Sequence, residues 1–151
     1  MNIKKSVLLS LVMSLLFFGA NAYSAEKPIS LSVDCQPLSQ RPGAPAVAIS
    51  GLVKLKKQPN GAFMGAGKLS IRISTTRGET ILEQEKVAVN AYFDDILVPT
   101  LQAVPKDEES VIANLALFQK KDDTEEEDQS LLSTVELKDG TTYYTQCNLT
   151  K

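Results

Sequence analysis

Hydrophobic and polar residues alternate along most of the chain after residue 28, and this period of two predicts β-strands rather than helices. The first alternating segment places its apolar residues on one strand face, and they are Ile29, Leu31, Val33 and Cys35. The second segment repeats the pattern with Val47, Ile49, Gly51, Val53 and Leu55. Residues 36–45 between them hold three prolines and a glycine, which predicts an irregular loop.

A hairpin is predicted at Pro59-Asn60-Gly61, because Asn-Gly readily adopts the positive φ angles of a tight turn. The returning strand directs alternate residues inward, namely Leu69, Ile71, Ile73 and Thr75. Gly65 and Gly67 lie on the same arm, where they indicate a bulge or a closely packed backbone. A longer loop over 58–67 could instead protrude from the domain.

The middle of the chain has a less regular pattern. Residues 80–93 predict one bent strand or two, with Val87, Val89 and Ala91 in one register, and a strand is preferred to a short helix over 79–86. Residues 97–104 predict a further strand or a short edge piece. The segment 111–119 is apolar on both faces, so we expect a central strand covered on both sides.

The C-terminal segment predicts a closing hairpin, with strands over 131–138 and 141–149 around Asp139-Gly140. In its last strand, Tyr143, Thr145, Cys147 and Leu149 lie on one face, so Tyr144 points outward. The count of about eight short strands predicts an all-β fold, either an antiparallel β-sandwich or a small β-barrel.

The N-terminus predicts a cleaved signal peptide over residues 1–22. Lys4 and Lys5 precede an apolar run over 7–18, and Ala20-Asn21-Ala22 matches the small-x-small cleavage pattern. The run is shorter than the roughly 20 residues of a membrane span. We therefore expect one domain over residues 23–151, periplasmic or secreted, with no membrane insertion of the mature chain.

The two cysteines, Cys35 and Cys147, allow a single intramolecular pairing, and an exported chain meets an oxidising compartment. Both fall on the predicted inner faces of the first and last strands. A redox pair is usually spaced C-x-x-C, and two thiolates without histidine are too few for structural zinc. We therefore expect one structural disulfide that closes the domain, with the first and last strands either neighbours or facing each other across the core.

Composition excludes several classes of function. The chain has no histidine, which removes Ser-His-Asp and Cys-His catalysis and every histidine-ligated metal site. Its net charge of −2 becomes −4 when Lys4 and Lys5 leave with the signal peptide. Such mild acidity lacks the basic excess of a nucleic-acid binder and gives no reason to expect attraction to anionic membranes.

A run of charged residues over 120–128 is the conspicuous polar feature. Its carboxylates could hold calcium, but they lack the spacing and central glycine of an EF-hand loop, so a solvated loop is favoured. A docking surface for a basic partner is a third interpretation. The candidate interaction surface therefore comprises Tyr144, Asp122, Asp123, Glu125, Glu126, Glu127 and Asp128.

These observations favour a non-enzymatic exported β domain, without cofactor or metal, that binds an unidentified protein or surface polymer or supports an envelope assembly. Two alternatives remain open. An eight-stranded barrel could carry a small apolar ligand in its interior. A secreted inhibitor could instead insert the loop 58–67 into the cleft of an extracellular hydrolase.

Overall fold

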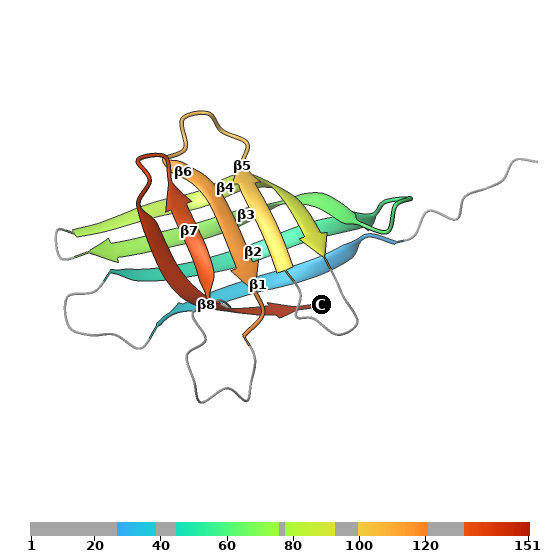
Figure 1. Ribbon diagram of the computed structural model, residues 1–151, viewed down its shortest axis with the longest axis horizontal. Helices are drawn as coiled ribbons and strands as arrows, with labels where there is room; N and C mark the ends of the chain where they lie inside the picture. The colour runs from blue at the N-terminus through green and yellow to red at the C-terminus, as the bar shows by residue number, and fades with distance from the viewer. Residues whose placement is uncertain (1–26, 39–44, 76–77, 93–99, 121–131) are drawn as a thin grey trace, which may run out of the picture.

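Eight antiparallel strands form a closed barrel in the computed structural model, which describes residues 27–38, 45–75, 78–92, 100–120 and 132–151 (of 79–84 only the backbone). Each strand pairs with the next one along the chain, and β8 returns to pair with β1 (Figure 1). The strands are β1 (Ile29–Pro37), β2 (Ala46–Lys57), β3 (Phe63–Thr75), β4 (Gly78–Tyr92), β5 (Thr100–Pro105), β6 (Ile112–Phe118), β7 (Ser133–Leu137) and β8 (Thr142–Thr150). Pairing between the first and last strands decides between the two predicted architectures in favour of the barrel.

The alternation in the sequence sorts residues between the interior and the outer surface of the barrel. The apolar positions predicted for the first two strands are buried except Ile29 and Gly51, which are half-buried. Leu69, Ile71 and Ile73 of β3 are buried as well. On β8, Thr145, Cys147 and Leu149 are buried as predicted, and Tyr143 packs against the core. Thr75 was predicted to face inward and is instead exposed, because it is the last residue of β3.

Three glycines on the inner faces of β2 and β3 let these strands approach closely. A Cβ atom on Gly67 would lie 2.5 Å from the carbonyl oxygen of Leu52, and one on Gly65 would overlap the carbonyl of Lys54. Gly51 has a φ angle of +156°, and a Cβ there would overlap the carbonyl of Lys68. Glycine is therefore required at these positions, which confirms the closely packed backbone expected for this arm and allows the hairpin to bend into a barrel.

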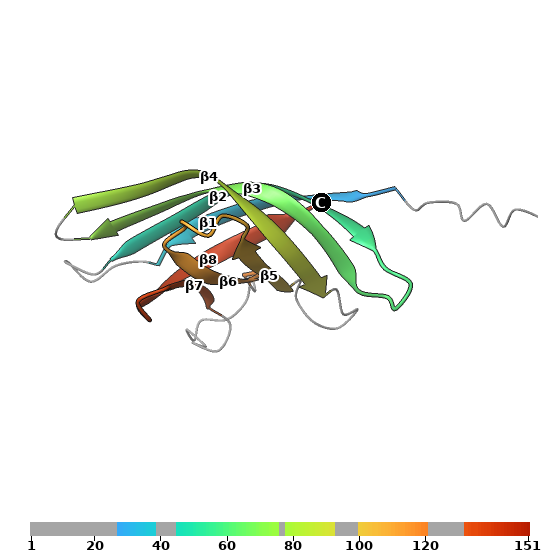
Figure 2. The same ribbon diagram turned by 90° about the horizontal axis from the view of Figure 1, so that it is seen from above.

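The β2–β3 hairpin turns at Pro59-Asn60-Gly61, as predicted. The Gly61 N–H donates to the carbonyl of Gln58 at 2.9 Å, and Gly61 adopts a φ angle of +86°. Phe63 already belongs to β3, so the turn is shorter than the loop over 58–67 that the sequence also allowed. Strands β2 to β4 are the longest of the barrel, and the β2–β3 hairpin projects past the shorter strands (Figure 2).

Register irregularities explain where the alternation was hard to follow. The pairing of β4 with β3 shifts between Leu69 and Ile71 of β3. The segment over 79–86 is part of β4, which confirms the prediction of a strand rather than a short helix. In β6 the pairing shifts between Ile112 and Asn114. This irregularity lets Ile112 and Leu115 both face the core despite their odd spacing.

The expectation that β6 is covered on both sides is wrong. Val111, just before the strand, is 47% exposed, and no other strand in the described part of the chain covers the outer face of β6. A barrel wall has one interior and one outer face, so the second set of apolar residues in this segment remains partly accessible to solvent.

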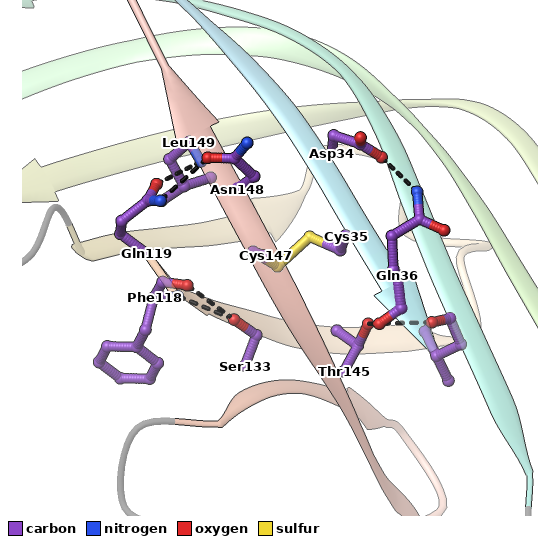
Figure 3. Close-up of a disulfide and its surroundings, with 11 residues drawn as sticks. Asp34, Cys35, Gln36, Phe118, Gln119, Ser133, Thr145, Cys147, Asn148 and Leu149 are labelled. Carbon is purple, nitrogen blue, oxygen red and sulfur yellow. Dashed lines mark hydrogen bonds between the residues drawn. A yellow bond between two sulfur atoms is a disulfide. The ribbon is translucent and has the colours of Figure 1, made fainter. Parts of the chain in front are cut away.

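The disulfide Cys35–Cys147 lies at the seam where β1 meets β8, and both cysteines are fully buried (Figure 3). The two residues are directly opposite in the register, and 112 positions separate them in sequence. This confirms the predicted pairing. A disulfide is compatible with an oxidising, exported compartment.

Polar side chains reinforce the same seam. The Thr145 hydroxyl lies 2.7 Å from the carbonyl oxygen of Gln36 and 2.9 Å from that of Val47, so its single hydrogen serves both β1 and β2. The Gln119 amide, just after β6, donates to Asn148 Oδ1 at 2.9 Å and accepts from the Leu149 N–H (Figure 3). Hydrogen bonds therefore join four strand segments around the disulfide.

Candidate functional site

The interior of the barrel offers no chemically reactive site among the described residues. Its large aliphatic side chains are almost fully inaccessible, which means that they do not line a cavity of even water size. The three buried polar residues are Ser110, Ser133 and Thr145, and each makes side-chain hydrogen bonds. No buried side-chain nitrogen or oxygen in the described part lacks a partner. Within the described part of the chain, the outer surface is therefore the remaining place for a site.

Of the interaction surface predicted from sequence, the structure places one residue. Tyr144 points outward from β8, is 50% exposed, and lies opposite Thr134 of β7. The carboxylates of the acidic run lie outside the described residues; they are Asp122, Asp123, Glu125, Glu126, Glu127 and Asp128. Tyr144 alone on an open strand face does not form a site.

A shallow depression of about 210 Å³ lies on the outer surface of β1, β2 and β3. Its floor is formed by small residues, and its edges by Asp34, Gln36 and Arg72. The Gln36 amide donates to Asp34 Oδ1 at 2.7 Å, so these two polar groups already satisfy one another. The depression is polar and open, which suits ordered water better than a specific small ligand.

A second outer surface, spanning β2 to β5, gathers exposed apolar side chains. The described residues expose six large apolar side chains, and four of these point outward from adjacent strands of this surface: Leu52 at 48%, Met64 at 51%, Tyr92 at 58% and Val104 at 50%. Single exposed apolar residues are ordinary on protein surfaces, whereas interaction surfaces are one place where several occur on the same face.

Lysines surround these apolar side chains. The cross-strand register places Leu52 opposite Lys68 and Lys68 opposite Lys86. The next row runs Lys54, Ala66, Ala88, Val104, and the following row Lys56, Met64, Asn90, Gln102. We call the eleven residues of these three rows, together with Tyr92 and the opposite Thr100, the basic wall. Its members are Leu52, Lys54, Lys56, Met64, Ala66, Lys68, Lys86, Ala88, Asn90, Tyr92, Thr100, Gln102 and Val104.

The basic wall carries no negative charge of its own. The segments 46–75, 86–92 and 100–105 contain neither aspartate nor glutamate. Glu85 directly precedes Lys86 of the wall in the sequence, and its carboxylate accepts a hydrogen bond from Ser110 Oγ at 3.2 Å. None of the ammonium groups of Lys54, Lys56, Lys68 and Lys86 forms an ion pair with another described residue, and all four residues are exposed. The wall is therefore locally positive on a chain whose net charge is negative.

Comparison with known protein families, curated proteins and solved structures finds no match. Within the described ranges, no group of three or more aspartate, glutamate or cysteine residues is arranged to hold a metal ion. The described part of the chain likewise contains no helix long and apolar enough to cross a membrane.

Sequence reasoning did not find the basic wall. The alternation within β2 and β3 directs Lys54, Lys56 and Lys68 outward, but the rows form only through the register between neighbouring strands, which alternation within one strand does not specify. One signal was present in the sequence: the absence of acidic residues from 46–75, within an otherwise acidic chain.

Proposed function

We propose that the mature chain is an exported, non-enzymatic binding protein of the cell envelope, periplasmic or secreted, that contacts its partner through the basic wall. One observation carries the proposal: most of the large apolar side chains that the described residues expose lie on one wall among four lysines, and the wall itself includes no aspartate or glutamate. Exposing such a group to solvent has no structural benefit, whereas binding to a partner would cover it.

Export is supported by two independent features. The sequence carries the pattern of a cleaved signal peptide, and Cys35 and Cys147 form a disulfide, which persists in oxidising compartments. The absence of histidine from the chain and the pairing of every buried polar side chain in the described part support a binding role rather than catalysis.

The experiment compares two variants of equal charge in the full mature chain. A wall variant replaces lysine by glutamine within the basic wall, at Lys54, Lys56, Lys68 and Lys86. A control variant makes the same change at exposed lysines elsewhere, at Lys27, Lys120, Lys138 and Lys151. Retention of each purified protein by a washed envelope fraction of the source cells is then measured.

We expect the wild type and the control variant to be retained and the wall variant to be lost. Retention of both variants to the same extent would contradict binding through the basic wall. Failure of the wild type itself to be retained would contradict an envelope partner.

A projecting hairpin keeps the hydrolase inhibitor as a second candidate. The turn at Pro59-Asn60-Gly61 is exposed and held by two backbone hydrogen bonds between Gln58, Gly61 and Ala62, so it could enter a cleft without much loss of conformational entropy. Inhibition of a panel of extracellular hydrolases at micromolar protein, abolished by replacing Asn60 and Gly61 with alanine, would support it. A carrier role has no comparable support, because the described interior is filled by side chains.

A further inference from the structure

From the chemistry of the basic wall we infer its partner: the anionic phosphate headgroup layer of a lipid bilayer, on which the barrel lies without inserting. This inference rests on the proposed function, since it assigns a partner to the same surface. The wall combines the two components of peripheral membrane binding, cationic side chains and apolar side chains that reach the headgroup boundary.

Lysine without arginine distinguishes a lipid surface from an acidic protein. Protein–protein interfaces are enriched in arginine and depleted in lysine, because the planar guanidinium makes directed, bidentate bonds to carboxylates. The basic wall has four lysines and no arginine. A flexible ammonium group gives positive charge without fixed geometry, which suits a fluid layer of phosphates.

The centre of the wall is formed by two short side chains. Ala66 and Ala88 are directly opposite on β3 and β4, and together they form a floor between the lysines. A protein partner usually inserts a large anchoring residue into a well-packed pocket, whereas two neighbouring alanines present only short side chains. A headgroup layer needs no pocket, since it adapts to the shape of the wall.

The apolar side chains surround that floor where they could reach below the phosphates. Leu52 and Met64 flank Lys54 and Ala66 on one side, and Val104 follows Ala88 on the other. Tyr92, the most exposed of the four, lies one row beyond Asn90 and brings an aromatic ring with a polar hydroxyl, the type of side chain enriched at membrane interfaces. Flanking lysines can keep their charges at phosphate level while their aliphatic portions cover the apolar contact.

The net charge of the chain does not oppose this contact. Charges farther apart than a Debye length, about 8 Å at physiological ionic strength, are largely screened from one another. A membrane therefore meets the local charge of the wall rather than the average of −4 over the mature chain. Screening also predicts that the contact weakens as salt concentration rises.

The test uses protein-free vesicles. The oxidised mature chain, the wall variant and the control variant are sedimented with vesicles of phosphatidylglycerol mixed with phosphatidylcholine, and with vesicles of phosphatidylcholine alone. We expect the wild type to bind the anionic vesicles in a salt-sensitive manner and the neutral ones far more weakly.

Removing four lysines from the contact should reduce the partition coefficient by at least about tenfold, since each basic residue near an anionic surface adds several-fold in affinity. The control variant should bind within about twofold of wild type, because its lysines lie away from the contact.

A second variant tests the apolar part of the contact. Leu52→Gln together with Met64→Gln retains every charge, so purely electrostatic attraction predicts unchanged binding, whereas penetration of the headgroup boundary predicts a loss of several-fold. Circular dichroism and thermal unfolding of each variant establish that the fold is retained.

Two results would overturn the inference. The first is a wild type that does not bind anionic vesicles, and the second is a wall variant that binds them as well as the control variant does. The wild type could fail to bind anionic vesicles while its retention by envelope fractions still depends on the basic wall. If protease treatment of those fractions then abolishes the retention, the partner is an acidic protein. The proposed function would then stand while the lipid assignment fails.

Discussion

The basic wall and the β1–β8 seam occupy the same barrel but use their side chains in opposite ways. At the seam, Cys35 bonds to Cys147, Thr145 bridges two carbonyls, and Gln119 pairs with Asn148. On the wall, lysines and apolar side chains face solvent without partners among the described residues. The seam therefore stabilises the fold, whereas the wall leaves its side chains available for an external surface.

The largest expected effect comes from removing the disulfide. Cys35→Ala together with Cys147→Ala should lower the free energy of unfolding by about 4–5 kcal/mol, because the bond closes a loop of more than 100 residues in the unfolded chain. Urea unfolding of the oxidised wild type and of the double variant measures this difference.

Reduction of the wild type provides the control, since dithiothreitol should produce a loss of similar size without any substitution. Binding to anionic vesicles should be unchanged at temperatures where the variant remains folded. A stable variant that loses vesicle binding would show that the seam and the wall are not independent.

The next largest effect lies beneath the wall, on its inner face. Gly67→Val would place a branched side chain against the carbonyl of Leu52, so we expect a loss of about 3 kcal/mol or failure to fold. Ala66→Val is the matched control: it introduces the same residue one position earlier on the outer face, and its effect should stay within about 0.5 kcal/mol. Equal losses for the two variants would contradict the close approach of β2 and β3.

A smaller effect is expected at the seam from Thr145→Val, which removes the buried hydroxyl and retains the side-chain shape. The loss of its hydrogen bonds to the carbonyls of Gln36 and Val47 should cost about 1 kcal/mol. Thr142→Val on the exposed end of the same strand should change stability little, and chemical denaturation of both variants checks the difference. No loss at Thr145 would mean that the carbonyls are satisfied without it.

Alternation of hydrophobic and polar residues was sufficient to predict the strands at the seam and their inner faces, while the pairing of Cys35 with Cys147 followed from the number of cysteines. It was misleading in β6, where a register shift brings residues with odd spacing onto one face. Whether the strands close into a barrel depends on contacts between β1 and β8 and on close packing at Gly51, Gly65 and Gly67. These are long-range features, and a period of two within one strand does not contain them.

The wall was harder to predict than the seam for the same physical reason. Cys35 and Cys147 each carry a chemical preference for one partner, so two cysteines in an exported chain specify their own pairing. A lysine carries no such preference, and Lys68 and Lys86 become neighbours only because β3 and β4 adopt one particular register. Surfaces assembled from several strands therefore require the structure before they can be recognised.

The smallest expected effect gives the clearest separation of the two regions. Lys68 lies directly opposite Lys86 on neighbouring strands, and like charges in that position repel. Lys68→Gln should therefore leave the free energy of unfolding unchanged or raise it by a few tenths of a kcal/mol, with the gain largest at low salt because added ions screen the repulsion.

Lys138→Gln, outside the wall, should show no such gain, since the Lys138 ammonium donates to the carbonyl of Glu108. A loss of more than about 1 kcal/mol for Lys68→Gln would mean that the wall lysines stabilise the barrel, as the seam does. Retention of stability with loss of vesicle binding would show instead that this pair is kept, despite its repulsion, for contact with a partner.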